Sequence, residues 1–292
     1  MQIPPPREAG FTTTTTAPLY WCRYGSPEAP TLLVLHGGPG AHHDYLLPQM
    51  LALADDYELV FYDQRGGGQS KTDDRTPITW QTHVNDLDQV VSELGIDPLD
   101  IVGYSWGGLL AMLYAIEAAA GRTTHRPRRL VLIDPAPINR EYRREFEAEF
   151  NRRQAGADVA KLRADLAESG LREREPEAYR QRNFELSVAG YFSDPTVAHD
   201  LTPFRVTGRV QQSVWESLGD FDLSAPGRLD SVTVPTLIVH GRDDPIPFAS
   251  SEAAARALHA ELVMIPGSGH VPYVEEPRQL FHAIREFLDR TS

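Results

Sequence analysis

A serine between two glycines is the residue of this chain whose surroundings most clearly point to chemistry. Ser105 stands in Gly-Tyr-Ser-Trp-Gly at 103–107, after the apolar run 99–102 and before the helix-compatible run 109–115. A strand, a tight turn and a helix in this order form a nucleophile elbow, in which glycines relieve the crowding at the turn. The helix N-terminus beside the turn favours developing negative charge. The pattern predicts a nucleophilic Ser105, although a small-residue turn without chemistry has the same letters.

A nucleophilic serine needs a base and an acid that orients the base, and in this arrangement the acid and then the histidine follow the serine along the chain. The predicted strand 234–240 ends in a turn that carries Asp243 and Asp244. Adjacent side chains point in different directions, so only one of the two can face the base. We predict that Asp244 is the catalytic acid. The alternatives are Asp243 and Asp134, which closes another predicted strand, and either can instead be a turn or capping residue.

His270 is the histidine whose position fits the catalytic base. It follows the predicted strand 261–265 across a loop of Pro, Gly and Ser residues, so it lies just beyond the carboxyl end of a strand. Active sites of open α/β sheets collect at this edge. His36 and His240 also end apolar strands, but a buried structural imidazole is the simpler interpretation there. We therefore predict that His270 is the base.

A glycine-rich loop is expected to supply hydrogen-bond donors for an oxyanion. The loop His-Gly-Gly-Pro-Gly at 36–40 directly follows the apolar strand predicted at 31–35. Glycines have no Cβ atom, so their backbone N–H groups can approach a substrate closely. One donor is predicted to be the amide of Gly38, and the other the amide of Trp106, the residue after the nucleophile.

Five short segments together carry a family signal. They are the loop 36–40, Asp-Gln-Arg-Gly-Gly-Gly-Gln-Ser at 63–70, the serine turn 103–108, Gly-Arg-Asp-Asp at 241–244 and Gly-Ser-Gly-His at 267–270. This combination resembles the prolyl aminopeptidase (proline iminopeptidase) group of α/β-hydrolases. The resemblance implies the α/β-hydrolase fold, with a mostly parallel central sheet flanked by helices and an inserted helical cap. It also implies serine hydrolase activity on small amides or esters through an acyl-enzyme.

The sequence departs from the family pattern at the positions that bind the amino group of the substrate. In prolyl aminopeptidases glutamates hold the free amine, one directly after the catalytic aspartate and another in the cap. Here Pro245 follows the aspartate, and Gln211 aligns near the second glutamate, with Glu216 as a neighbour able to replace it. The alternative to an aminopeptidase is therefore a carboxylesterase with little or no aminopeptidase activity. A non-hydrolytic lyase and a catalytically silent binding module rank last, the latter because a fold alone does not require all of these residues.

The alternation of strand and helix signals is interrupted in the middle of the chain. Residues 1–137 and 226–292 alternate in the manner of a parallel sheet and are predicted to form the hydrolase core. The segment 138–225 has charged helical patterns between prolines, which predicts a helical cap, or lid domain, over the site. In it Tyr142, Phe146 and Phe150 recur at helical spacing and form one apolar stripe.

Candidate substrate-binding residues come from the predicted cap. They are three aromatic residues and one acid: Phe184, Tyr191, Trp215 and Glu216. Each aromatic ring can equally serve to hold the cap together. Neither a cofactor nor a metal is expected, and the glycine run at 66–68 lacks the spacing of a nucleotide-binding loop.

Composition and charge narrow the possible partners and location. The 292 residues include 41% hydrophobic residues, enough for a sizeable core. No apolar run approaches the roughly 20 residues of a membrane span, and the first residues lack the apolar segment of a signal peptide. The one cysteine, Cys22, lies in an alternating strand pattern and is expected to be buried, which fits a cytoplasmic location. The net charge of −13 argues against nucleic acid and anionic membranes as partners and does not identify a substrate. The expected partner, a small-molecule or short-peptide substrate, is implied by the family resemblance.

Overall fold

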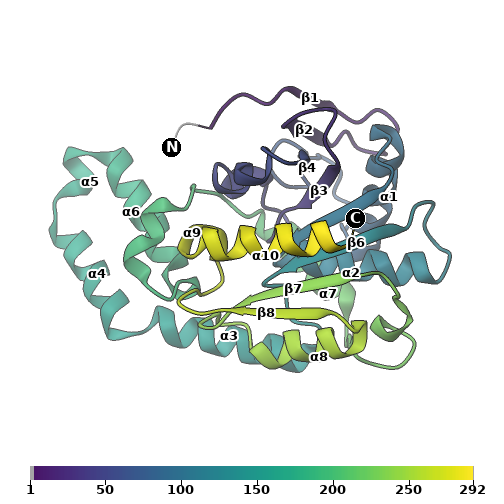
Figure 1. Ribbon diagram of the computed structural model, residues 1–292. Coiled ribbons are helices and arrows are strands. Elements are labelled where there is room, and N and C mark those ends of the chain that lie inside the picture. Colours follow the sequence, from purple (N-terminus) through teal and green to yellow (C-terminus); the bar gives the residue numbers. More distant parts are fainter. Residues whose placement is uncertain (1–2, 292) are drawn as a thin grey trace.

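An eight-stranded sheet forms the centre of the molecule in the computed structural model, which describes residues 3–291 (Figure 1). The strands lie in the order β1-β2-β4-β3-β5-β6-β7-β8. β2 is antiparallel to both β1 and β4, and the remaining neighbours are parallel. The bounds are β1 (Glu8–Phe11), β2 (Tyr20–Tyr24), β3 (Thr31–Leu35), β4 (Glu58–Tyr62), β5 (Leu99–Tyr104), β6 (Pro127–Ile133), β7 (Thr236–Gly241) and β8 (Glu261–Ile265).

The central strands are continuous apolar runs because both faces of the sheet are covered. In β3, Leu33 and Leu35 belong to one buried cluster, whereas Leu32 and Val34 belong to a second cluster on the opposite face. This alternation follows from the two-residue repeat of a strand. The covered faces hold the sheet in place and leave its carboxyl edge for the site.

Helices from both ends of the chain cover the two faces. The first cluster includes residues of α1 (Trp80–Leu94), α2 (Trp106–Ala119), α8 (Phe248–Leu258) and η5 (Leu229–Ser231). The second includes residues of α10 (Pro277–Arg290), α9 (Pro272–Glu275) and the short 3₁₀ helices η1 (His43–Leu46) and η2 (Gln49–Leu53). Figure 1 shows α10, in yellow, running across the sheet.

Between β6 and β7 the chain leaves the sheet and forms helices. These are α3 (Arg140–Gln154), α4 (Ala157–Glu168), α5 (Leu171–Arg174), α6 (Pro176–Val188), η3 (Ala189–Tyr191), η4 (Pro195–Asp200) and α7 (Gly208–Leu218). Figure 1 shows α4, α5 and α6 standing to one side of the sheet, away from α1. We call residues 138–225 the cap segment. The predicted helical character of this segment is confirmed, and its status as a separate lid domain stays a prediction.

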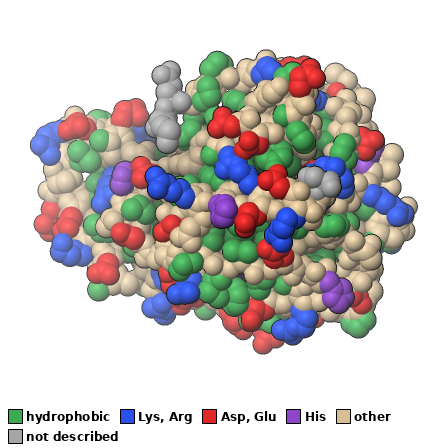
Figure 2. Space-filling view, in the orientation of Figure 1, with side chains coloured by type: hydrophobic (Ala, Val, Ile, Leu, Met, Phe, Trp, Pro, Cys, Tyr) green, Lys and Arg blue, Asp and Glu red, His purple; other side chains and the backbone are tan. Residues whose placement is uncertain are grey.

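Local details differ little from the sequence expectations. β5 continues to Tyr104, two residues beyond its predicted end, and β7 begins at Thr236 because Pro235 has no N–H to offer to the ladder. Cys22 is buried, as its alternating pattern predicts. None of the helices between residues 3 and 291 is long and apolar enough to cross a membrane. Figure 2 shows acidic and basic side chains interspersed over the face that carries α10.

Candidate active site

Ser105 occupies the sharp turn between β5 and α2. Its backbone has φ 53° and ψ −117°, a strained conformation for a residue with a side chain. A Cβ atom at Gly103 would lie 2.5 Å from the carbonyl oxygen of Gly107. A Cβ atom at Gly107 would lie 2.2 Å from the carbonyl oxygen of Leu35. Gly103 is therefore required by the tightness of the turn, and Gly107 by the close approach of the end of β3.

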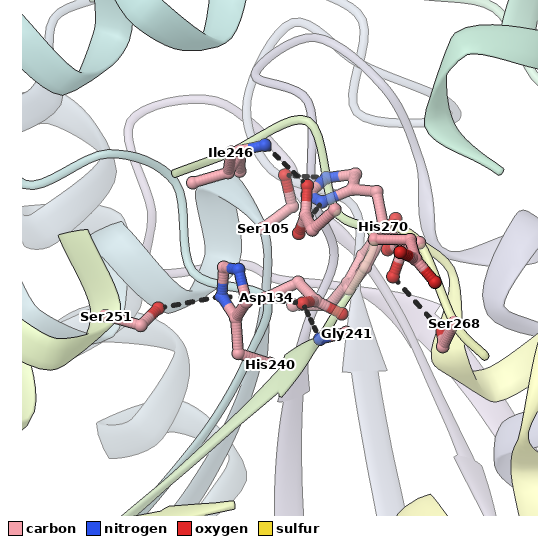
Figure 3. A network of polar contacts seen from close by, with 12 residues as sticks. Ser105, Asp134, His240, Gly241, Ile246, Ser251, Ser268 and His270 are labelled. Atoms are coloured by element: carbon pink, nitrogen blue, oxygen red, sulfur yellow. Dashed lines mark hydrogen bonds and ion pairs between the residues drawn. The ribbon is translucent and has the colours of Figure 1, made fainter. Parts of the chain in front are cut away.

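His270 joins Ser105 to Asp244 (Figure 3). Nε2 of His270 lies 3.0 Å from Oγ of Ser105, and Nδ1 lies 2.8 Å from Oδ2 of Asp244. The other oxygen of Asp244 accepts a hydrogen bond of 2.7 Å from the backbone N–H of Ile246, which fixes the carboxylate. The structure thus brings together the three residues that chain order and strand ends select.

The two alternative acids do not face His270. Asp243 accepts a hydrogen bond of 3.1 Å from the hydroxyl of Ser193, so its side chain points toward the cap segment. Asp134 directly follows β6, is fully buried, and accepts a hydrogen bond of 2.8 Å from the N–H of Gly241 through Oδ1. Its other oxygen, Oδ2, finds no hydrogen-bond donor among residues 3–291. Asp134 is therefore a neighbour of the site with a different environment.

Asp134 and Asp244 are two buried acids that lie side by side. One carboxylate oxygen of each, together with a ring nitrogen of His240, lie within 4.8 Å of one another. Burial, followed by the charge of Asp244, raises the pKa of Asp134 well above its ordinary range. Burial also raises the pKa of Asp244 to about 7, against the effect of a hydrogen bond from Asp134. The proton of the pair therefore belongs to Asp134, whose O–H donates to the charged Asp244.

His270 is neutral in this environment. Burial lowers the pKa of its imidazole to about 4, although the nearby acids Asp134 and Glu275 act in the opposite direction. Because Asp244 accepts the hydrogen of Nδ1, the lone pair of the neutral ring is on Nε2, which faces Ser105. A neutral imidazole in this tautomer can accept the proton of the serine hydroxyl.

The cluster of Asp134, His240 and Asp244 also has the composition of a metal site. Apart from Oδ2 of Asp134, however, the carboxylate oxygens of this cluster and Nδ1 of His240 already have hydrogen-bond partners. Gly241 donates to Asp134, both oxygens of Asp244 accept hydrogen bonds, and Nδ1 of His240 lies 2.9 Å from the hydroxyl of Ser251 (Figure 3). We assign this cluster to the hydrogen-bond network that supports His270.

The glycine loop after β3 lies against the serine turn. A Cβ atom at Gly37 would lie 2.9 Å from Cβ of Ser105, and the N–H of Gly37 donates to the hydroxyl of Tyr45 at 2.6 Å. Gly38 has a φ of 56°, in the left-handed region that favours glycine. Gly38 and Trp106, the two predicted oxyanion donors, line the same cavity as Ser105.

Gln64 links the two segments that carry these donors, although the sequence analysis did not single it out. Its side-chain amide donates to the carbonyl of His36 at 2.8 Å, and its side-chain carbonyl accepts from the indole of Trp106 at 2.8 Å. Gln64 is buried directly after β4. The sequence feature that could have identified Gln64 is its position within the family segment 63–70.

The cap segment touches the His270 loop directly. The backbone N–H of His270 donates to the carbonyl of Tyr191 at 2.7 Å, and the Tyr191 ring stacks on the imidazole with centroids 5.0 Å apart. The Glu275 carboxylate accepts hydrogen bonds of 2.7 Å from the N–H groups of Ser193 and Gly269. Glu275 thereby ties the cap segment to the loop that carries the base.

A cavity of about 250 Å³ lies in front of Ser105 and is lined by both the core and the cap segment. We call it the active-site cavity. Tyr191 and Trp215, two of the predicted substrate-binding residues, line it. Phe184 does not line it and instead lines a separate cavity of about 900 Å³. Glu216 lines another cavity of about 280 Å³, so substrate binding by Phe184 and Glu216 stays a prediction without support from the active-site cavity.

Helix geometry and packing explain why Glu216 and Phe184 do not line the active-site cavity. On α7, Gln211 and Trp215 are four residues apart, share one face and line the active-site cavity. Glu216 is one residue further along, which rotates it by about 100°, and it accepts a hydrogen bond from the side chain of Gln212 instead. Phe184 lies on α6, where its ring packs edge-on against Phe204.

One face of α3 supplies residues that the sequence analysis missed. Arg143, Phe146, Glu147 and Phe150 line the active-site cavity at a spacing of three or four residues. Phe146 and Phe150 belong to the apolar stripe that the sequence shows. The stripe was a sufficient signal for a helix face turned toward the protein, but it did not identify the cavity as the partner of that face.

A mostly parallel sheet with its serine after β5, its acid after β7 and its histidine after β8 defines a hydrolase of the α/β type. Residues 32–283 match the model of the alpha/beta hydrolase family, and the chain belongs to this family. The predicted family and fold are thereby confirmed.

Known proteins similar to this chain include peptidases. A proline iminopeptidase of Levilactobacillus brevis is 30% identical, over 86% of this chain and 85% of that protein. The crystal structure of the proline iminopeptidase of Mycobacterium smegmatis has a TM-score of 0.69 at 22% identity, over 97% of this chain and 98% of that one. The crystal structure of VinJ has a TM-score of 0.69 at 23% identity, over 99% and 100% of the two chains. The structural likeness concerns the fold.

Proposed function

We propose that this hydrolase cleaves small esters or amides through an acyl-enzyme on Ser105. The observation that carries the proposal is the hydrogen-bonded line from Ser105 through His270 to Asp244, with distances of 3.0 and 2.8 Å. The neutral imidazole and the adjoining glycine loop support the same proposal. A cavity of about 250 Å³ suits a small molecule or the end of a short peptide as substrate.

The proposed reaction has two similar halves. Nε2 of His270 takes the proton of Ser105 as Oγ attacks the carbonyl carbon, and Asp244 stabilises the resulting imidazolium. The amides of Gly38 and Trp106 donate to the oxyanion of the tetrahedral intermediate. When that intermediate collapses, His270 returns the proton to the leaving alcohol or amine. Water, deprotonated by the same imidazole, then attacks the acyl carbon. The bond between this carbon and Oγ breaks, His270 returns the proton to Oγ of Ser105, and the acid is released.

Covalent labelling and one substitution test the nucleophile. A fluorophosphonate probe is expected to label the wild-type protein once, and mass spectrometry of the labelled peptide is expected to locate the label on Ser105. Ser105→Ala is expected to lose the label and to reduce kcat by about 10³-fold or more, with unchanged thermal unfolding. Near-normal turnover by Ser105→Ala would contradict the acyl-enzyme.

Within this class, we infer that small esters are hydrolysed at least as well as proline amides, although several relatives are proline iminopeptidases. The acid that lines the active-site cavity in the described chain is Glu147, and it already pairs with Arg143 at 2.8 Å. Moving the ammonium group of a substrate from water into the cavity costs several kcal/mol when no protein carboxylate is free to pair with it. An ester without a free amine does not carry this cost.

The comparison of two chromogenic substrates tests this inference. We expect kcat/KM on p-nitrophenyl butyrate to equal or exceed kcat/KM on proline p-nitroanilide. Glu147→Gln removes the cavity acid, and Glu216→Gln is the matched control outside the cavity. A strong preference for the proline substrate that Glu147→Gln abolishes and Glu216→Gln retains would show that Glu147 binds the amine.

A further inference from the structure

Arg143 is a cation in the wall of the active-site cavity, and the proposed reaction gives it no role. It lies on α3 and lines the cavity together with Ser105 and His270. Its guanidinium lies over the ring of Trp215, with Cζ 3.6 Å from the ring centroid. Stacking of this kind fixes the plane of the guanidinium and leaves its N–H groups directed outward around the edge. Arg143 is therefore a pre-oriented hydrogen-bond donor in the cavity.

The donor capacity of Arg143 is largely unused. Nε donates to Glu147 at 2.8 Å, whereas Nη1 is buried and finds no hydrogen-bond partner within residues 3–291. Burial lowers the pKa of the guanidinium, so the charged group has lost hydration that its protein contacts do not fully replace. A guanidinium with five N–H donors and one such contact is suited to a ligand with acceptor oxygens.

The surroundings of Arg143 favour an anion over a second cation. Glu147, its ion-pair partner, has a side chain that is 50% exposed, against 25% for Arg143, so Glu147 is the better hydrated of the two. The imidazole of His270 is neutral because burial lowers its pKa to about 4. Asn151 and Gln211 add uncharged amide groups to the lining. The least compensated charge in the cavity is thus the positive charge of Arg143.

We propose that Arg143, held over the ring of Trp215, binds a carboxylate of the substrate during hydrolysis at Ser105. The end of the guanidinium formed by its two Nη atoms matches the two oxygens of a carboxylate. The substrates would then be small esters or amides that carry a carboxylate away from the scissile bond. This inference rests on the proposed function and specifies its substrate class.

Two matched ester pairs test the inference. Mono-4-nitrophenyl adipate and 4-nitrophenyl hexanoate have acyl chains of equal length, with and without a terminal carboxylate. 4-Acetoxybenzoate and 4-acetoxybenzamide place the charge on the leaving group instead. For at least one pair, we expect the ratio of kcat/KM for the charged ester to kcat/KM for the neutral ester to fall about tenfold or more in Arg143→Gln. The pair that responds shows whether the bound carboxylate belongs to the acyl group or to the leaving group. Arg143→Lys keeps the positive charge but loses the paired Nη donors. Its charged-to-neutral ratio of kcat/KM should lie between those of Arg143→Gln and the wild type.

Arg144→Gln is the control, because it makes the same change of charge one residue away at an exposed position. It should leave both ratios as in the wild type. Calorimetry with adipate provides a readout without turnover, and binding to Ser105→Ala should weaken about tenfold or more when Arg143→Gln is added. Ratios and adipate binding that Arg143→Gln leaves unchanged would overturn the carboxylate site, even if Ser105-dependent hydrolysis of the neutral esters persists. No Ser105-dependent hydrolysis of any ester would instead overturn the proposed function, while adipate binding would still report on Arg143.

Discussion

Helices α2 and α3 both face the active-site cavity, but they are held in place in different ways. In α2, 12 of 14 residues are buried, from Trp106 to Ala118. In α3, which is one residue longer, none is buried. α2 is fixed by the core on all sides, so the serine turn at its N-terminus is fixed too. α3 is amphipathic and meets the molecule through a single face.

The difference separates the chemistry of the site from its specificity. Ser105, Asp244 and His270 follow strands of the sheet, whereas Arg143, Phe150 and Trp215 line the cavity from the cap segment. A reaction that depends on distances of about 3 Å needs the rigid support of a packed core. Cavity-lining residues on solvated helices can be substituted with a smaller loss in the free energy of unfolding.

The largest effect that would sharpen this comparison is expected at the sheet edge. Asp244→Asn should reduce kcat by about 10²-fold to 10⁴-fold, because an amide at this position no longer holds the imidazole in the required tautomer. Asp243→Asn is the adjacent control, and its carboxylate contacts Ser193. Steady-state kinetics of the two variants decide the assignment. Equal losses of kcat in both variants would show that activity depends on the turn as a whole and not on the contact between Asp244 and His270.

Stability should also differ between core and cap segment. Leu110→Ala removes a fully buried side chain from α2 and should cost about 2–5 kcal/mol in the free energy of unfolding. Leu162→Ala makes the same change in α4, where the side chain is only partly buried, and should cost about 1 kcal/mol. Equilibrium unfolding in urea measures both values. Similar losses at the two positions would mean that the cap segment contributes to the core as much as α2 does.

The smallest effect concerns the buried acid behind the site. Asp134→Ala removes the O–H that donates to Asp244, and the pKa of Asp244 should therefore rise further. Since Asp244 must be charged, the acidic limb of kcat/KM should move to higher pH by about one unit. Asp134→Asn keeps an N–H donor and should move the limb less. A pH profile that is the same in all three proteins would remove Asp134 from the network.

Much of the hydrolase core was predictable because its signals are local. Glycines at 103 and 107 are required by contacts within the turn itself and with the adjacent strand end, so the sequence alone identifies the elbow. The apolar run of β3 was predicted with its observed bounds, since a strand buried on both faces leaves a continuous pattern. Chain order then selected Asp244 and His270.

The tertiary structure decided what depends on the relative placement of elements. The apolar stripe of α3 predicts which face of the helix is turned toward the protein, yet it does not show whether that face meets a cavity or another helix. Phe184 and Glu216 were predicted in the site for this reason, whereas Arg143 was not. The proton shared by Asp134 and Asp244 likewise requires the ends of β6 and β7 to be adjacent, across 110 positions of sequence. Side-chain proximity between distant segments is set by packing of whole elements, and no local pattern of residues encodes it.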